Sequence, residues 1–209
     1  KVPPKVQQLM NSNVPLVFIN KFLDKKKLHA VGVDNYQSVL LAVEHLAKLG
    51  HKRIGTLKGG MTSVDGVERF LAFRKAMEQL GLTYDERFVG EANFNDDQAY
   101  HEMKRILLQR TLPTAMYCAN DLMAIGAMKA IHEHGLSVPD DIALAGYDDL
   151  EAGRYISTPL TTVRPPTEYV RFRAFEILMD ILQKPTQPAT QVPLPSELVI
   201  RASTVKPLR

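Results

Sequence analysis

Cysteine is nearly absent from this chain of 209 residues, because Cys118 is the single one. One cysteine excludes a disulfide within the chain and fits a reducing compartment, so we expect a cytoplasmic protein. The sequence also lacks an uninterrupted apolar stretch of the roughly 18 residues that a membrane-spanning helix needs. Its opening residues show no apolar core of a signal peptide. We therefore expect no membrane partner.

Motifs of the common catalytic and metal sites are missing as well. The six histidines include no HExxH pair and no combination with cysteine at zinc spacing. The sequence contains no GxSxG elbow, no GxxxxGK[ST] phosphate loop and no GxGxxG fingerprint. We therefore predict no metal, no cofactor and no enzymatic activity, with a sugar-acting enzyme kept as a third alternative.

Charge of one sign is also scarce, which argues against a nucleic-acid surface on this chain itself. The 26 basic and 23 acidic residues leave a net charge of only +3. The one tight basic cluster, residues 25–27, lies between two leucines. A solvated surface loop is favoured there over a phosphate-binding patch.

What the sequence does contain is a regular alternation of strand and helix patterns. Five short apolar runs predict buried strands, and five segments with apolar residues at helical spacing follow or separate them. This alternation predicts an α/β fold with parallel strands and helices on both faces. Three segments, 49–53, 157–166 and 184–188, indicate passages between domains. The predicted strands are 16–19, 30–33, 54–57, 115–118 and 142–145, and the helical stripes are 39–49, 70–80, 99–107, 128–131 and 170–181.

Polar residues follow two of these strands at the point where each strand ends. Asn120 and Asp121 follow the strand at 115–118, and Asp148 and Asp149 follow the strand at 142–145. Because ligands bind beyond the carboxyl ends of parallel strands, Asn120 and Asp148 are candidate contacts for a polyhydroxylated ligand. Neighbouring side chains point to opposite sides, so Asp149 is expected to cap the following turn instead of forming a catalytic pair.

Other loop residues allow two interpretations. Asp65 and Glu68 have the spacing of a capping box, which places Arg69 in the first turn of a helix. On this pattern alone, a cap and a solvated arginine are favoured over an arginine that grips a ligand. Phe94 is equally compatible with loop packing and with an apolar face for a sugar ring or base. Gly59, with Gly60, predicts a turn that brings backbone close to a ligand.

Six segments, in matching order and spacing, resemble the lactose/galactose-repressor (LacI/GalR) family of transcriptional regulators. The resemblance extends through essentially all 209 residues. Single motifs of this length would be weak evidence, but six in register are specific. They are LGHKRIG (49–55), ERFLAFRKAMEQLGL (68–82), PTAMYCANDLMAIGAMKAI (113–131), VPDDIALAGYDDL (138–150), PLTTVRPP (159–166) and ELVIRAST (197–204).

The resemblance implies a two-lobed periplasmic-binding-protein type I fold, with three crossing strands and an effector bound between the lobes. Residues 1–50 and 161–187 would form the first lobe, which is incomplete relative to the family. Residues 51–160 and 188–209 would form the second. The effector contacts implied by the family pattern are Ser63, Asp65, Arg69, Phe94, Asn120 and Asp148.

The implied function is that of an effector-sensing region of a dimeric transcriptional regulator, most simply a repressor. Operator DNA would be bound only through a helix-turn-helix headpiece that these residues do not include. Members of the family sense sugars, sugar phosphates or nucleobases. Asp65 is acidic where many relatives have a hydroxyl or amide, so a neutral sugar is the favoured effector. The alternative is a periplasmic sugar-binding protein of a transport system, which shares the fold and would carry a secretion signal upstream.

Overall fold

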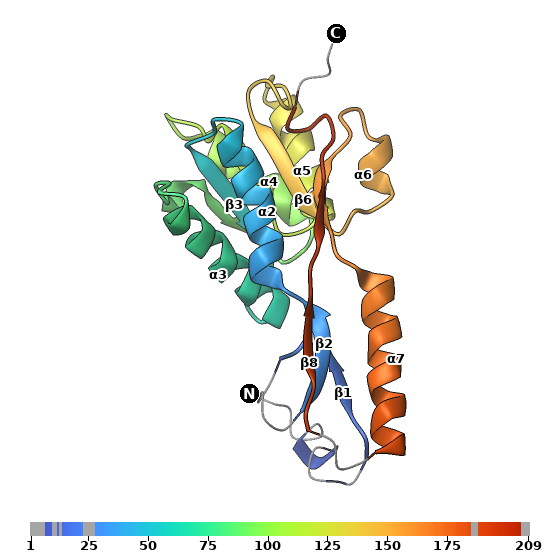
Figure 1. The fold of residues 1–209 in the computed structure, drawn as a ribbon. Helices are drawn as coiled ribbons and strands as arrows, with labels where there is room; N and C mark the ends of the chain where they lie inside the picture. Colours follow the sequence, from blue (N-terminus) through green and yellow to red (C-terminus); the bar gives the residue numbers. More distant parts are fainter. Residues whose placement is uncertain (1–6, 10–11, 13, 23–27, 185–187, 206–209) are drawn as a thin grey trace. The chain divides into compact units, whose positions relative to one another are not determined.

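The computed structural model describes residues 7–9, 12, 14–22, 28–184 and 188–205 (Figure 1). The basic cluster at 25–27 lies outside the described residues. The chain divides into two compact units, and it passes from one to the other at three points. The smaller unit comprises Lys1–Asp34 and Pro166–Leu194, and the larger comprises Asn35–Pro165 and Pro195–Arg209.

These boundaries differ from the expected lobes in three segments. Residues 35–50 and 161–165 belong to the larger unit, and residues 188–194 belong to the smaller one. The first difference arises because helix α2 (Asn35–Lys48) packs Val39 and Leu46 into the same core as Phe73 of the larger unit. Of the three expected passages, only 157–166 contains an observed boundary, the one after Pro165. Residues 49–53 fall within the larger unit, and residues 184–188 fall within the segment assigned to the smaller one.

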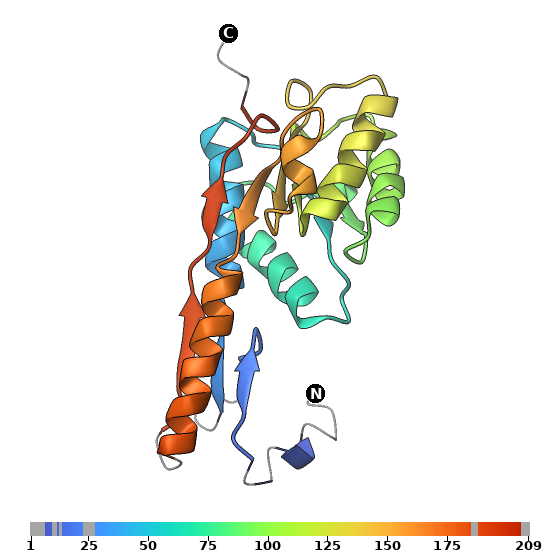
Figure 2. The same ribbon diagram turned by 90° about the vertical axis from the view of Figure 1, so that its right-hand side faces the viewer.

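The larger unit is built on a six-stranded sheet. Figures 1 and 2 show α2 and α3 (Val64–Gln79) on one side of this sheet, and α4 (Asp96–Leu107) and α5 (Asp121–Glu133) on the other. All neighbouring strands are parallel except the last pair, β7 and β9. The predicted α/β fold with helices on both faces is therefore confirmed. The strand order is β4 (Val89–Glu91), β3 (Ile54–Lys58), β5 (Ala115–Cys118), β6 (Ala143–Tyr147), β7 (Thr161–Arg164) and β9 (Glu197–Val199).

Two apolar clusters pack against the two faces of this sheet. Met116 of β5 packs with residues of α4 and α5, such as Met103 and Ile131. Tyr117, the next residue, packs on the opposite face with Phe73 of α3. Because both faces are covered, every residue of β5 is buried, which explains its continuous apolar run.

The smaller unit contains a three-stranded parallel sheet in the order β1 (Val17–Ile19), β2 (His29–Val33) and β8 (Gln191–Leu194). Helix α7 (Thr167–Gln183) packs Val170 and Ile177 against Val31 of this sheet. All five predicted strands exist, with ends shifted by no more than two residues. The sequence did not predict β4, β7, β8 or β9. Two short elements, η1 (Glu86–Phe88) and α6 (Ala152–Tyr155), complete the larger unit.

Three helices end at glycines as the sequence predicts, but the predicted N-terminal cap of α3 needs a correction. Gly50, Gly81 and Gly135 have φ angles of 94°, 64° and 80°, in the left-handed region that glycine tolerates at a helix end. The capping box predicted at Asp65 is wrong, because Ser63 caps α3 and its Oγ accepts a hydrogen bond from the Gly66 amide at 3.0 Å. Within the described part of the chain, no helix is long and apolar enough to cross a membrane.

Candidate functional site

The carboxyl ends of four neighbouring strands meet at one edge of the larger sheet. Parallel pairing of β4, β3, β5 and β6 aligns these ends, so the loops that follow them share one edge. All six predicted contact residues belong to this unit. Phe94, Asn120 and Asp148 lie in the loops after β4, β5 and β6, and Ser63, Asp65 and Arg69 begin α3, which follows β3.

Arg69 links helix α3 to the ends of two strands. Its Nη1 donates a hydrogen bond to the carbonyl oxygen of Ala119, after β5, at 2.6 Å. The same nitrogen lies 3.8 Å from Oδ1 of Asp148, after β6. The Arg69 side chain is only 12% exposed, and that of Asp148 is 34% exposed. The structure therefore brings these two predicted residues together, and it excludes the interpretation of Arg69 as a solvated surface residue.

Aromatic rings lie against the same guanidinium. Its Cζ is 3.6 Å from the ring centroid of Tyr147 and 5.9 Å from that of Phe94. A guanidinium over an aromatic face is attracted by the ring quadrupole, more strongly where water is excluded. Burial raises the pKa of the Tyr147 phenol, so this ring stays neutral and keeps its cation-binding face. The two rings therefore help to position the guanidinium of Arg69.

Asp148 has an unusual backbone. Its φ of 115° lies where residues other than glycine are uncommon, and such conformations concentrate at functional sites. The Asp148 amide donates to the Val163 carbonyl at 2.9 Å, which ties this loop to β7. Burial raises the pKa of its carboxyl group, Arg69 lowers it, and Asp65 raises it. The result is a partly exposed acceptor beside a buried cationic donor.

Asn120 and Phe94 hold each other in place. Asn120 is 7% exposed, and its Oδ1 accepts from the Met123 amide at 3.0 Å, which caps α5. Its Nδ2 donates to the Phe94 carbonyl at 3.4 Å and keeps one hydrogen for another acceptor. Phe94 itself has a φ of 61° and is half-buried. Both residues therefore stabilise the loops at this edge, in addition to any contact with a ligand.

Ser63 and Asp65 are also engaged within the protein. The Ser63 hydroxyl donates to the Gly60 carbonyl at 2.9 Å while it caps α3. Asp65 Oδ1 accepts from Nδ2 of Asn35 at 3.3 Å. The Ser63 hydroxyl already donates one hydrogen bond to a neighbouring backbone group and accepts another, so it has the least capacity for a ligand among the six predicted residues.

Sequence reasoning missed Asn35 and Tyr147. Asn35 is buried, receives a hydrogen bond from Nε of Arg69 at 3.3 Å, and donates to Oε2 of Glu68 at 2.7 Å. The polar residues after the predicted strand at 30–33 carry the same signal as Asn120 and could have identified Asn35. Tyr147 gives no such signal, because a fully buried tyrosine at a strand end resembles an ordinary core residue.

Asp149 does not cap the turn, which corrects the expectation from the sequence. Its carboxylate accepts from Arg154 at 2.8 Å, Arg164 at 2.6 Å and Arg201 at 2.5 Å. Burial alone would raise the pKa of this carboxyl group, but the bonds from the three arginines lower it overall. This cluster therefore anchors the loop after β6 to α6, β7 and the segment after β9.

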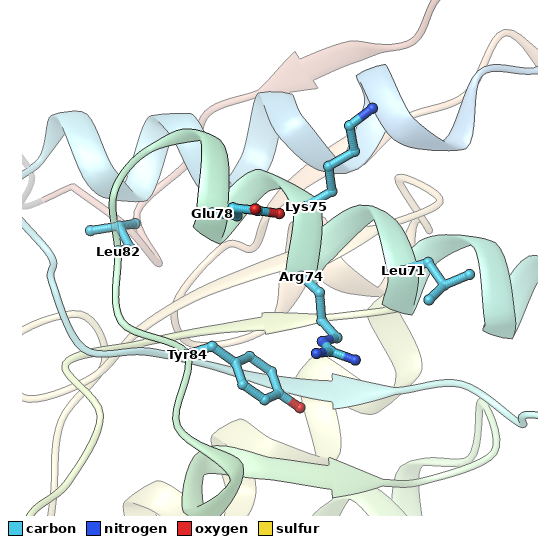
Figure 3. A pocket seen from close by; sticks show the side chains of 6 residues that line it. All are labelled: Leu71, Arg74, Lys75, Glu78, Leu82 and Tyr84. Carbon is cyan, nitrogen blue, oxygen red and sulfur yellow. The ribbon is translucent and has the colours of Figure 1, made fainter.

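A separate groove of about 640 Å³ runs along the outer side of α3. Figure 3 shows Arg74 of α3 reaching toward the ring of Tyr84, whose centroid lies 5.1 Å from Cζ of Arg74. None of the six predicted contacts lines this groove, which is formed by Leu71, Arg74, Lys75, Glu78, Leu82 and Tyr84. Among the residues that the structure describes, no three metal-binding side chains gather into a possible metal site.

Gly59 makes room for the Phe94 ring, which gives a first test of the site. A β-carbon at Gly59 would lie 2.1 Å from Cζ of Phe94, whereas one at Gly60 would meet Oδ1 of Asn93 at 3.0 Å. We expect Gly59→Ala to displace the ring and to lower the free energy of unfolding by about 1–3 kcal/mol. The neighbouring control, Gly60→Ala, meets only the end of a flexible side chain and should cost less. Urea denaturation of the two variants measures this, and equal losses would contradict the placement of Phe94.

Comparison with known proteins agrees with this architecture. Residues 43–204 match the family described as periplasmic binding protein-like domain. The HTH-type transcriptional repressor PurR of Pasteurella multocida (strain Pm70) is 36% identical over 192 residues, which are 92% of this chain and 58% of that protein. The chain thus spans about three-fifths of the length of this relative.

Two solved structures are similar in fold and in sequence. The transcriptional regulator CelR–cellobiose complex matches with a TM-score of 0.89 and 30% identity, over 97% of this chain and 63% of that one. The Lac repressor dimer bound to operator and the anti-inducer ONPF matches with a TM-score of 0.85 and 30% identity, over 93% of this chain and 58% of that one. These relatives are transcriptional regulators.

Proposed function

Because the chain belongs to the periplasmic binding protein-like domain family, and within it to the lactose/galactose-repressor (LacI/GalR) family, we propose that it senses a small-molecule effector for a DNA-binding transcriptional regulator. The effector would bind at the carboxyl edge of the six-stranded sheet. Arg69 and Asp148 would make the main polar contacts, with support from Asp65, Phe94 and Asn120, and a smaller part for Ser63.

The observation that carries this proposal is the pairing of Arg69 with Asp148, with the rings of Tyr147 and Phe94 near the same guanidinium. A charged donor and a charged acceptor 3.8 Å apart can bind two neighbouring polar groups of one ligand. The Phe94 ring offers an apolar face within the same group of residues. Binding sites for small molecules combine a few placed polar groups with aromatic surface in this way.

A neutral sugar is the favoured class of effector. Asp65 and Glu68 both accept a hydrogen bond from Asn35, which itself accepts from Arg69, and Asp148 lies 3.8 Å from Arg69. Three carboxylates this close to the proposed contacts disfavour a ligand that is itself anionic. The similarity to a regulator solved with cellobiose supports a sugar. A nucleobase is the second candidate, because the Phe94 ring would stack on a planar base as well as on a sugar face.

We propose further that the protein acts as a dimer, as a repressor and in the cytoplasm, without catalytic turnover. The similarity to a Lac repressor dimer on its operator supports the dimer and the DNA partner. Operator DNA would be contacted by a headpiece outside residues 1–209. The alternative function is that of a periplasmic sugar-binding protein for transport. The match to the periplasmic binding protein-like family is compatible with this alternative, but the similarity to a transcriptional repressor favours the regulator.

A thermal-shift screen of sugars, including cellobiose, and of nucleosides and nucleobases tests this proposal. A ligand at one hundred times its Kd should stabilise the native state by about 2.7 kcal/mol. For a chain of this size, the melting temperature should rise by roughly 5–10 °C. The shift should grow with ligand concentration, and the recovered ligand should be chemically unchanged. A library that gives no shift, or a hit that is converted to product, would contradict effector sensing.

A further inference from the structure

Asp121 is a buried carboxyl residue that is not among the proposed ligand contacts. It is 0% exposed and is the first residue of α5, directly after Asn120. Its Oδ1 accepts from the hydroxyl of Thr162 in β7 at 2.6 Å, and its Oδ2 accepts from the Leu150 amide at 2.7 Å. One side chain therefore joins the start of α5, strand β7 and the loop after β6.

The loop that donates this hydrogen bond has an uncommon backbone conformation. Asp148 and Asp149 have consecutive φ angles of 115° and 52°, and residues other than glycine keep such strained conformations only where their surroundings enforce them. Two side chains bind backbone amides of this loop. Thr162 Oγ1 accepts from the Asp149 amide at 3.3 Å, and Asp121 accepts from that of Leu150.

The two acceptors are not independent of each other. The Thr162 hydroxyl has one hydrogen, which it donates to Asp121, and this leaves its lone pairs directed to the Asp149 amide. Asp121 therefore fixes the orientation of the group that holds Asp149. The sheet also leaves room for this carboxylate, because a β-carbon at Gly146 would lie 2.2 Å from Asp121 Oδ1.

We infer that Asp121 is a positioning residue that holds the strained loop after β6 in the conformation that presents Asp148 to the ligand. The inference rests on the proposed function, because the position of Asp148 matters only if Asp148 contacts the effector. It adds a residue that lies behind the site and contacts the loop instead of the ligand.

The loop requires the two hydrogen bonds of the Asp121 side chain more than it requires a negative charge there. The pKa of Asp121 is raised to about 7, and burial is the largest cause. Hydrogen bonds from Thr162 and Leu150 act to lower this pKa, and the nearby Asp148 and Asp149 act to raise it. A carboxyl group with this pKa is readily protonated near neutral pH. The neutral acid can donate to Thr162 and still accept from Leu150, and an asparagine amide can do the same. Asparagine should therefore replace aspartate here, and alanine should not.

Amide hydrogen exchange and HN–Hα couplings of the ligand-free protein test the inference. In Asp121→Ala, exchange of the Leu150 and Asp149 amides should be faster by about tenfold, and the couplings of Asp148 and Asp149 should leave their left-handed values. Asp121→Asn should restore both readouts. The matched control is Asp96→Ala, since Asp96 is the exposed first residue of α4 after its own asparagine cap and should change neither.

The outcomes separate positioning from the proposed function. If Asp121→Ala folds and keeps the couplings and exchange rates of the parent, the inference is overturned. If Asp121→Ala does not fold, Thr162→Val decides, because it should accelerate exchange at Asp149 and leave Leu150 protected. Unchanged exchange at Asp149 in that variant would also overturn the inference. No ligand enters these measurements, so an error in the effector assignment would show in the thermal-shift screen and not here.

Discussion

The Arg69→Ala variant is expected to lose most of the stabilisation that an effector gives the parent protein. Removing a charged hydrogen-bond donor that faces the ligand costs roughly 3 kcal/mol, which weakens binding about a hundredfold. At a concentration of one hundred times the parent Kd, the remaining stabilisation is then only about 0.4 kcal/mol. The melting shift should fall from roughly 5–10 °C to about 1 °C.

Thermal melts with and without the strongest compound from the screen measure this loss. Each variant is compared with its own unliganded melt, because Arg69→Ala also leaves the Ala119 carbonyl without its donor. Asp148→Ala should lose most of the shift for the same reason, as the acceptor of the pair. Arg74→Ala is the matched control, since Arg74 lies five residues further along α3 and lines the separate groove. A full shift in both Arg69→Ala and Asp148→Ala, with a lost shift in Arg74→Ala, would move the site to that groove.

The Asp149→Ala variant is expected to show the largest loss of stability. The Asp149 side chain is 3% exposed and neutralises three arginines. Breaking a buried ion pair from one side costs about 3–5 kcal/mol, because the remaining charge is left without a partner. The lower end applies here, since Arg154 and Arg164 are 46% and 42% exposed and can turn toward water. Arg201, at 14% exposed, cannot turn out as easily.

Chemical denaturation at neutral pH measures the difference in free energy of unfolding between the parent protein and Asp149→Ala. A loss of about 3 kcal/mol corresponds to a melting temperature lower by roughly 6–12 °C. The exposed control Asp97→Ala should change the free energy of unfolding by no more than about 0.5 kcal/mol. Because the folded pKa of Asp149 lies below the ordinary value of 3.8, its contribution is present above that value and is lost as pH falls through the folded pKa. The gap between parent and variant should therefore close in acid, and a gap that persists there would contradict the ion-pair explanation.

The strands and helices that could be predicted from the sequence are those with strong periodicity. The predicted ends of strand β5 match the observed ones, because its apolar run begins after Thr114 and stops just before the polar pair Asn120 and Asp121. Strand β4 is only three residues long and contains Gly90 and Glu91, so no apolar run marks it. Strand β8 includes Pro193, which weakens any strand pattern. Short strands of this kind are defined by their pairing with a neighbouring strand, which the local sequence does not show.

The predicted site residues were found for two different reasons. Asn120 and Asp148 follow from strand ends alone, since parallel neighbours bring their carboxyl ends together. Arg69 was selected through the family resemblance, because its local pattern favours a solvated residue. Its contacts with Ala119 and Tyr147 connect segments distant in the sequence, and no local pattern encodes such contacts.

The roles of the two aspartates after β6 show a second limit of sequence reasoning. Adjacent residues were correctly expected to serve different purposes. The partners of Asp149 could not be predicted, since Arg164 and Arg201 reach it from 15 and 52 positions away. Asn35 was missed although its strand-end pattern matched that of Asn120, so the same rule applied evenly would have found it.

A structure of this protein with the strongest compound from the screen is the most direct test of the effector site. The expected result is a ligand at the carboxyl edge of the six-stranded sheet, with polar atoms about 3 Å from the guanidinium of Arg69 and the carboxylate of Asp148. Its ring should lie against Phe94. A specifically bound ligand in the groove between Arg74 and Tyr84, or anywhere that leaves Arg69 and Asp148 untouched, would contradict the account.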